Sequence, residues 1–184
     1  KFEPIKYKVN FVVNGTTVST GDYAYGTQIS TIIPSGYAIP DGFSFEGWST
    51  DGSTVLDLSA ATVPANSVTY HAVLKPESGV KYTIETFLQN IGDGAGYAKQ
   101  ADEYGYGTTG DRIEYKAADK AGFTLNETRS ILVIESLAGN NSSKIKVFYD
   151  RNKVNVTISF THTKKYDEKI TQIFASGKTS LYMA

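Results

Sequence analysis

The 184-residue sequence contains no cysteine, which excludes a disulfide framework, thiolate catalysis and cysteine-ligated metal sites. It also lacks an excess of charge of either sign, because 18 basic and 19 acidic side chains give a formal net charge of −1. The composition therefore offers no electrostatic basis for binding nucleic acid or an anionic membrane surface. No apolar run approaches the ~18 residues that a transmembrane helix needs. We expect neither a nucleic-acid partner nor a membrane span.

Residues that favour strands and turns are abundant instead. The chain has 17 glycines and 13 tyrosines, but only one methionine and one tryptophan, Trp48. Tyr, Val, Ile, Thr and Phe favour strands, whereas Gly, Asn and Asp favour turns. The composition predicts a β-rich protein. The start of the sequence lacks the basic-then-apolar pattern of a signal peptide, so we expect any targeting segment to lie outside it.

Alternating apolar residues mark the expected strands. The run KYKVNFVV (6–13) is followed by Asn14–Gly15 and a second run, which is the strongest short-range signal for a hairpin. Another alternation occupies SVTYHAVL (67–74). The segment between these runs contains three prolines and several turn residues, so we expect one short helix at most and a strand around Phe43–Trp48.

The pattern then repeats after a polar segment at 77–80. Tyr7 corresponds to Tyr82, Gly42 to Gly122 and Val73 to Phe148, and these offsets stay between 75 and 80 residues. Insertions in loops between similar strands produce such a drift. We therefore predict a module at 1–76, a linker at 77–80 and a second module at 81–152. Residues 153–184 begin the pattern a third time, and we expect a hairpin that starts a truncated third module.

No motif in the sequence specifies catalytic chemistry. GYGTTG (105–110) fits a nucleotide-binding fingerprint by spacing, but a polar segment precedes it and no helix pattern follows, so we interpret it as a tight turn. His71 and His162 belong to different repeats and have no partner at ligand spacing. The acidic residues are scattered. We predict no catalytic residue, no cofactor and no metal site.

Two pairs of tyrosines are the candidate ligand-binding residues. Tyr23 and Tyr25, and likewise Tyr104 and Tyr106, stand two apart, so each pair shares one face of a strand. Such rings stack on a sugar or anchor a protein partner, or else they cover the small core of their own module. Both interpretations remain open. Flanking glycines make the second pair the better candidate for binding.

Residues 6–75 resemble a Listeria–Bacteroides repeat. The parts that carry the resemblance are YKVNFVVNGTTVSTGDYAYGT, IPDGFSFEGWSTDG and VPANSVTYHAVL, in that order. Residues 81–152 resemble the MucBP-like repeats that accompany such modules, through YTIETFLQN, GTTGDRIEYKA, GFTLNE and KVFYDRN. These resemblances imply small β-grasp-like folds in tandem in surface proteins attached to the bacterial cell wall. They imply spacer roles or binding of host glycans or proteins, and no catalytic residues.

The fold class expected is therefore mostly β or α+β, with tandem β-grasp-like modules and a trailing hairpin. We expect Trp48 to fill the core of the first module, and Leu125, Ile131 and Leu132 to fill the same space in the second. The function predicted is a non-enzymatic, extracellular stalk whose partners include neighbouring repeats. Direct adhesion to a host glycan or protein is the alternative, and a glycan-cleaving enzyme is the remote one.

Overall fold

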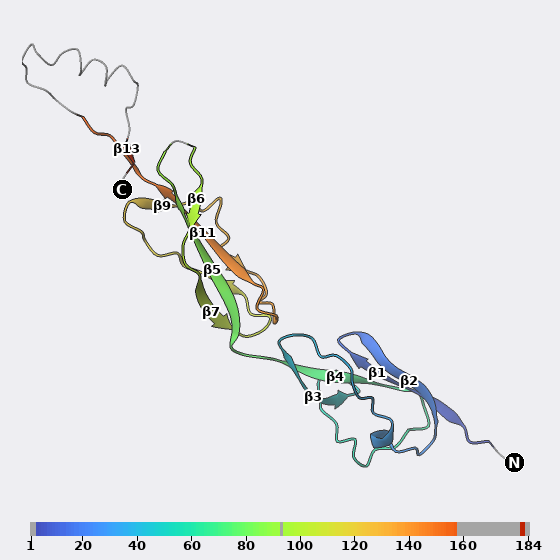
Figure 1. Cartoon of the computed structure of the whole chain (residues 1–184). Coiled ribbons are helices and arrows are strands. Elements are labelled where there is room, and N and C mark those ends of the chain that lie inside the picture. Colours follow the sequence, from blue (N-terminus) through green and yellow to red (C-terminus); the bar gives the residue numbers. More distant parts are fainter. Residues whose placement is uncertain (1–2, 93, 158–180, 183–184) are drawn as a thin grey trace, which may run out of the picture. The chain divides into compact units, whose positions relative to one another are not determined.

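The computed structural model describes residues 3–92, 94–157 and 181–182. Within them, the chain is built of β-strands joined by turns (Figure 1). The described residues form several small mixed sheets and no α-helix. A 3-10 turn, η1 (Ile29–Thr31), lies in the segment where a short helix was expected. The prediction of a mostly β chain is confirmed.

The chain packs into two compact units. Unit 1 comprises Lys1–Lys81 together with two later segments, Tyr106–Arg112 and Glu135–Ser142. Unit 2 comprises Tyr82–Gly105, Ile113–Ile134 and Ser143–Ala184.

Unit 1 contains a four-stranded sheet with the strand order β2-β1-β4-β3. Its strands are β1 (Lys6–Val13), β2 (Thr16–Ala24), β3 (Phe43–Ser49) and β4 (Val68–Pro76). The predicted hairpin joins β1 to β2, and both turn residues have positive φ, 45° at Asn14 and 76° at Gly15. Positive φ at both central residues is the geometry that Asn-Gly adopts most readily, and its twist matches that of the strands. β1 and β4 are the central strands and run parallel.

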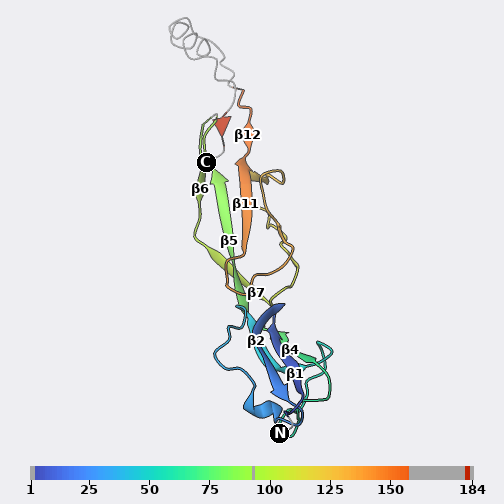
Figure 2. The ribbon, with the colours of Figure 1, turned by 90° about the vertical axis from the view of Figure 1, so that its right-hand side faces the viewer.

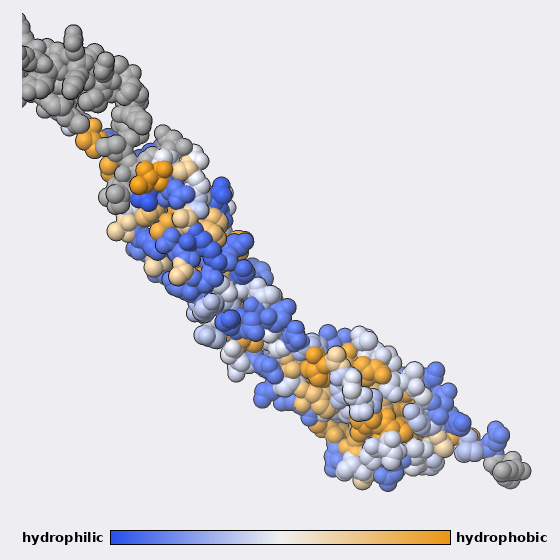
Figure 3. Space-filling model, in the orientation of Figure 1, coloured by the Kyte–Doolittle hydropathy of each residue, from blue (hydrophilic) through white to orange (hydrophobic). Residues whose placement is uncertain are grey.

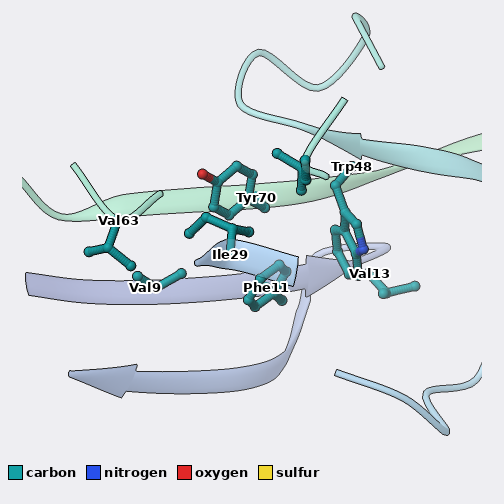
Figure 4. Packing of buried hydrophobic residues seen from close by; sticks show 8 residues of the cluster. Val9, Phe11, Val13, Ile29, Trp48, Val63 and Tyr70 are labelled. Carbon is teal, nitrogen blue, oxygen red and sulfur yellow. The ribbon is translucent and has the colours of Figure 1, made fainter. Parts of the chain in front are cut away.

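Aromatic and β-branched side chains fill the core of unit 1. Alternate residues of β1 (Val9, Phe11 and Val13) point to the same face of the sheet and are buried. Figure 4 shows Phe11 beside Trp48 and below Tyr70, which projects from β4. Trp48 is only 4% exposed, so its prediction as a core residue is confirmed.

A bulge in β3 positions this tryptophan. The register of β3 against β4 shifts between Phe45 and Gly47, and Gly47 has φ of 156°. A Cβ at Gly47 would collide with the side chain of Val55. Glycine is therefore required immediately before the ring that fills the core.

The two later segments of unit 1 attach through backbone contacts. The amide of Glu77 donates to the carbonyl of Gly42 (2.8 Å), and the amide of Thr109 donates to the carbonyl of Glu77 (3.0 Å). Gly139 packs so closely on the turn at Asp41–Gly42 that a Cβ on it would collide with the Asp41 carbonyl. Two glycine backbones therefore lie in contact, with no space for a side chain between them.

Unit 2 contains a sheet with the strand order β6-β5-β11-β9, and β7 also pairs with β5. Its strands are β5 (Val80–Gln89), β6 (Tyr97–Lys99), β7 (Glu103–Gly107), β9 (Phe123–Leu125) and β11 (Lys144–Arg151). The first two residues of β5 and the last two of β7 belong to unit 1. A small antiparallel pair is formed by β8 (Ile113–Glu114) and β10 (Val133–Ile134). The central strands β5 and β11 run parallel, and Figure 2 shows them side by side.

The two sheets share one strand order, which is the structural counterpart of the repeated sequence pattern. In each, the first strand of the repeat pairs in parallel with the last strand. The register corrects one correspondence. Because Tyr7 corresponds to Tyr82, Val12 corresponds to Phe87 at the same offset. Val12 lies opposite His71 and Phe87 lies opposite Phe148, so Phe148 corresponds to His71 and not to Val73.

The core of unit 2 differs from the sequence prediction. Ile131 is 50% exposed, so its prediction as a core residue is wrong. The physical reason is its backbone pairing with Lys146, which places both side chains on the face of the sheet opposite to buried Ile145 and Val147. Leu125 and Leu132 are half-buried. The large buried ring of this unit is Tyr149 of β11, whose hydroxyl donates to the carbonyl of Ala118.

The end of the chain is described only in part. β12 (Lys153–Val154) pairs in antiparallel fashion with β13 (Leu181–Tyr182). Of the hairpin predicted for 153–184, residues 158–180 and 183–184, which include His162, lie outside the described residues.

Candidate functional site

The four tyrosines predicted from the sequence differ in their surroundings. Tyr23 packs against the core of unit 1, and its ring folds over Gly21. Tyr25 lies just beyond the end of β2 and is 67% exposed. Tyr104 and Tyr106 lie in β7 and are 52% and 66% exposed. The structure therefore places one of the four rings against a core and three on the surface.

An apolar hollow adjoins Tyr25 in unit 1. It has a volume of about 410 Å³ and is lined by Pro4, Ile5, Tyr7, Tyr25 and Ala65. The amide of Tyr25 donates to the carbonyl of Ile5 (3.3 Å), which fixes the two segments together. No titratable group other than the tyrosine hydroxyls lines this hollow, so it offers a contact surface and no acid–base chemistry. Figure 3 shows orange apolar surface over unit 1 on the face in view, whereas blue polar surface predominates on unit 2.

A loop in unit 1 is held by a single carboxylate. Asp51 accepts hydrogen bonds from the hydroxyls of Ser49 and Thr54 and from the amides of Ser53 and Thr54, at 2.6 to 2.8 Å. These donors favour the charged form, and the Ser49 hydroxyl is the main cause that holds the pKa of Asp51 far below its usual range. Ser49 itself is fully buried. The carboxylate therefore ties the turn at Ser53 and Thr54 to Ser49 at the end of β3.

The face of the unit 2 sheet that lies opposite to Ile145 and Val147 carries charged groups. Glu85 is buried and accepts hydrogen bonds from Lys99 (3.0 Å) and Lys144 (2.9 Å), which extend from the strands on either side of it. The hydrogen bond from Lys144, followed by that from Lys99, lowers the pKa of Glu85. Lys99 also pairs with Asp102 at 2.7 Å. A carboxylate held between two ammonium groups ties three strands together and is not available as a general base.

An aromatic cluster continues this face. Phe87 and Phe148 stack with centroids 4.5 Å apart, and the ring of Tyr97 meets Phe148 edge-on at 5.1 Å. The hydroxyl of Tyr97 donates to Asp150, which raises the pKa of the tyrosine. The guanidinium of Arg129 lies over both Tyr97 and Phe148. The sequence pattern had marked Phe148 only as a landmark of the repeat, and it had marked none of the other residues of the cluster individually. The alternation of KIKVFYDR, which puts Phe148 and Asp150 on one face and Tyr149 on the other, was the signal that could have found part of the cluster.

The part of the chain that the structure describes holds no cluster of metal-ligating side chains. Within residues 3–92, 94–157 and 181–182, no group of three or more His, Asp or Glu side chains lies close enough to hold a metal ion. His71 is exposed on β4. In the same part of the chain, no helix has the length and apolar character that crossing a membrane requires.

Comparison with protein families identifies the first repeat. Residues 7–73 match the family model of the Listeria-Bacteroides repeat domain. The resemblance predicted for residues 6–75 is therefore confirmed, and this segment is a repeat of a kind typical of bacterial surface proteins. The MucBP-like resemblance of residues 81–152 gains no support from the comparison and stays a prediction. No curated protein matches the chain.

Proposed function

We propose that this chain is a non-catalytic repeat region of a bacterial cell-surface protein, and that it acts as a stalk that presents an adhesive region away from the cell. The family match over residues 7–73 supports the cell-surface setting. We place the chain outside the cell, attached to the cell wall, with neighbouring repeats of the same polypeptide as its permanent partners.

The observation that carries the proposal is the parallel pairing of the first and last strands in each sheet. β1 pairs with β4, and β5 pairs with β11. Because paired parallel strands run in the same direction, the chain enters a repeat at one end of the sheet and leaves it at the opposite end. A strand of 8 residues such as β1 spans about 26 Å at ~3.3 Å per residue. Each repeat therefore advances the polypeptide, whereas antiparallel terminal strands would return it to its starting end.

The same pairing suits a segment under tension. A force applied through the ends of a repeat acts along the two central strands in opposite directions, so all the hydrogen bonds of the ladder carry the load together. The ladder joins Val9–Val12 to Val68–His71 in the first sheet, and Thr83–Leu88 to Lys144–Tyr149 in the second. Stretching the chain by its two ends with optical tweezers tests the proposal. A stalk is expected to resist to high force and to unfold abruptly, and gradual extension at low force would contradict it.

We further propose that both repeats are β-grasp-like and that the second is MucBP-like. The shared order of four strands around a parallel central pair supports the first assignment. The landmarks GFTLNE and KVFYDRN support the second. Comparison with a solved structure of an established MucBP repeat tests the second assignment. That structure is expected to have the same strand order and a buried tyrosine at the position of Tyr149.

Direct adhesion is the second candidate function, and the exposure of Tyr25, Tyr104 and Tyr106 favours it. We propose a host glycan or an extracellular protein as the ligand. Titration of the chain against immobilised mucin and matrix proteins tests this function, with Tyr104→Ala/Tyr106→Ala as the variant. Saturable binding that is lost in the variant is expected of an adhesin. Absence of binding, or equal binding by the variant, would exclude these rings as the site.

A further inference from the structure

Two arginines of unit 2 lie over aromatic rings, and they differ in their hydrogen bonding. The Cζ of Arg151 lies 4.6 Å from the ring centre of Phe123, and its Nε donates to the carbonyl of Gln89 at 3.2 Å. Arg129 lies 5.1 Å from the ring centre of Tyr97 and 5.6 Å from that of Phe148. Within the described residues, the guanidinium of Arg129 donates to no acceptor. The guanidinium lies near both rings, and its N–H groups remain available to a ligand.

A network of short contacts fixes the loop that bears Arg129. The Oδ1 of Asn126 accepts from the amide of Arg129 at 3.0 Å, and its Nδ2 donates to Asp150 at 2.8 Å. The amide of Ser130 donates to the carbonyl of Asn126 at 3.0 Å, and the hydroxyl of Ser130 accepts from the amide of Phe148 at 2.9 Å. The backbone that bears the arginine is thus ordered before any ligand arrives, which lowers the entropy that binding costs.

Arg129 lines a polar hollow of about 480 Å³ together with Asn126 and Thr128. The hollow is shallow and open to solvent. Thr128 is exposed and carries a hydroxyl, and the Nδ2 of Asn126 has a second hydrogen beyond the one given to Asp150. The hollow therefore combines one fixed cation with neutral hydrogen-bonding groups.

The first repeat offers an internal comparison. The positions that correspond to Phe87 and Phe148 in the register are Val12 and His71. The aromatic platform under Arg129 is thus absent at the equivalent place in unit 1, although the strand order is the same. A platform needed only to hold this fold together would be expected in both repeats.

We propose that the hollow at Arg129 binds the carboxylate of an acidic sugar. A guanidinium presents two parallel N–H groups that match a carboxylate, and stacking on a ring leaves that edge exposed. The Thr128 hydroxyl and the Asn126 amide supply the partners that sugar hydroxyls require. Asp150 lies in the same network, and its negative charge opposes a doubly charged phosphate more than a singly charged carboxylate.

Titration of the whole chain with glucuronate, followed by nuclear magnetic resonance of backbone amides and arginine Nε–H groups, tests this proposal. Saturable shifts at residues 126–130 are expected with glucuronate, and none with glucose. An affinity for glucose equal to that for glucuronate, or a higher affinity for glucose 6-phosphate, would overturn the assignment to a carboxylate. Equal saturation by acetate would overturn the requirement for a sugar.

The matched variants are Arg129→Lys and Arg151→Lys, which make the same change at two arginines that each lie over an aromatic ring. Lysine keeps the positive charge but lacks the two parallel N–H donors of a guanidinium. Arg129→Lys is therefore expected to weaken glucuronate binding by about tenfold or more. Arg151→Lys is expected to change it less than about twofold, because that guanidinium is already engaged. Amide spectra outside residues 126–130 report whether each variant is folded. Equal weakening by both variants, or none by Arg129→Lys, would overturn the proposal.

Discussion

Phe11 and Tyr70 lie directly opposite each other across the parallel pair β1–β4, and their rings stack with centroids 5.3 Å apart. Trp48, from β3, meets Phe11 edge-on at 4.9 Å. One aromatic cluster therefore joins the first, third and last strands of the first repeat. The strands that would carry a load between the ends of the repeat are those that this cluster holds together.

Replacement of Trp48 is expected to destabilise unit 1 strongly. Trp48→Ala removes a buried ring and leaves a cavity, so the free energy of unfolding should fall by roughly 3–5 kcal/mol. Urea unfolding followed by circular dichroism measures the change. The control is Tyr25→Ala, an exposed ring whose loss should cost less than about 0.5 kcal/mol. Comparable losses in the two variants would mean that Trp48 is not the core residue described above.

Addition of one methyl group at Gly139 is expected to disturb unit 1. Its Cβ would meet the backbone of Asp41 and Gly42, which cannot move aside as a flexible side chain would. Gly139→Ala should therefore lower the free energy of unfolding by about 1–3 kcal/mol. Gly96→Ala is the matched control, because open space surrounds that position. A melting temperature that is unchanged in Gly139→Ala would show that the close backbone contact does not form in solution.

The charge on Glu85 is expected to make unit 2 sensitive to acid. Hydrogen bonds from Lys144 and Lys99 lower its pKa in the folded chain. The stability that it contributes is therefore fully present above its ordinary pKa, and is lost as the pH falls through the lowered value. Glu85→Gln should be less stable than the natural chain by about 1 kcal/mol near neutral pH. The difference should disappear in acid.

Urea unfolding across this pH range measures the difference, with Glu127→Gln at an exposed position as the control. A stability difference for Glu85→Gln that is independent of pH would contradict the assigned role of the two lysines.

Much of the fold could be predicted from local sequence signals. The turn residues Asn14–Gly15 predicted the first hairpin, and the sequence around Trp48 predicted the third strand and the core ring. The exposure of Ile131 could not be predicted, because it depends on a distant backbone pairing with Lys146. The same holds for Arg129. Tyr97, Phe148 and this arginine come from three segments far apart in the chain, so no local sequence spacing predicts their contact.

The loop at Asp51 is expected to lose its order when the carboxylate is removed. Asp51→Ala deletes the acceptor for the amides of Ser53 and Thr54, so these amides should exchange hydrogen with solvent much faster. Hydrogen–deuterium exchange measures this rate. Asp22→Ala, on exposed β2, is the control and should leave the loop unchanged. Protection of Ser53 and Thr54 that survives Asp51→Ala would show that other contacts order the loop.

The most direct test of the stalk is the force needed to unfold unit 1 in two pulling directions. Because the chain has no cysteine, handles attach only at introduced ones. Glu3→Cys with Ser78→Cys pulls β1 and β4 from opposite ends, whereas Thr16→Cys with Ser78→Cys pulls them from the same end and separates the ladder one bond at a time. We expect an unfolding force several times higher for the first pair. Equal forces, or a lower force for the first pair, would contradict it.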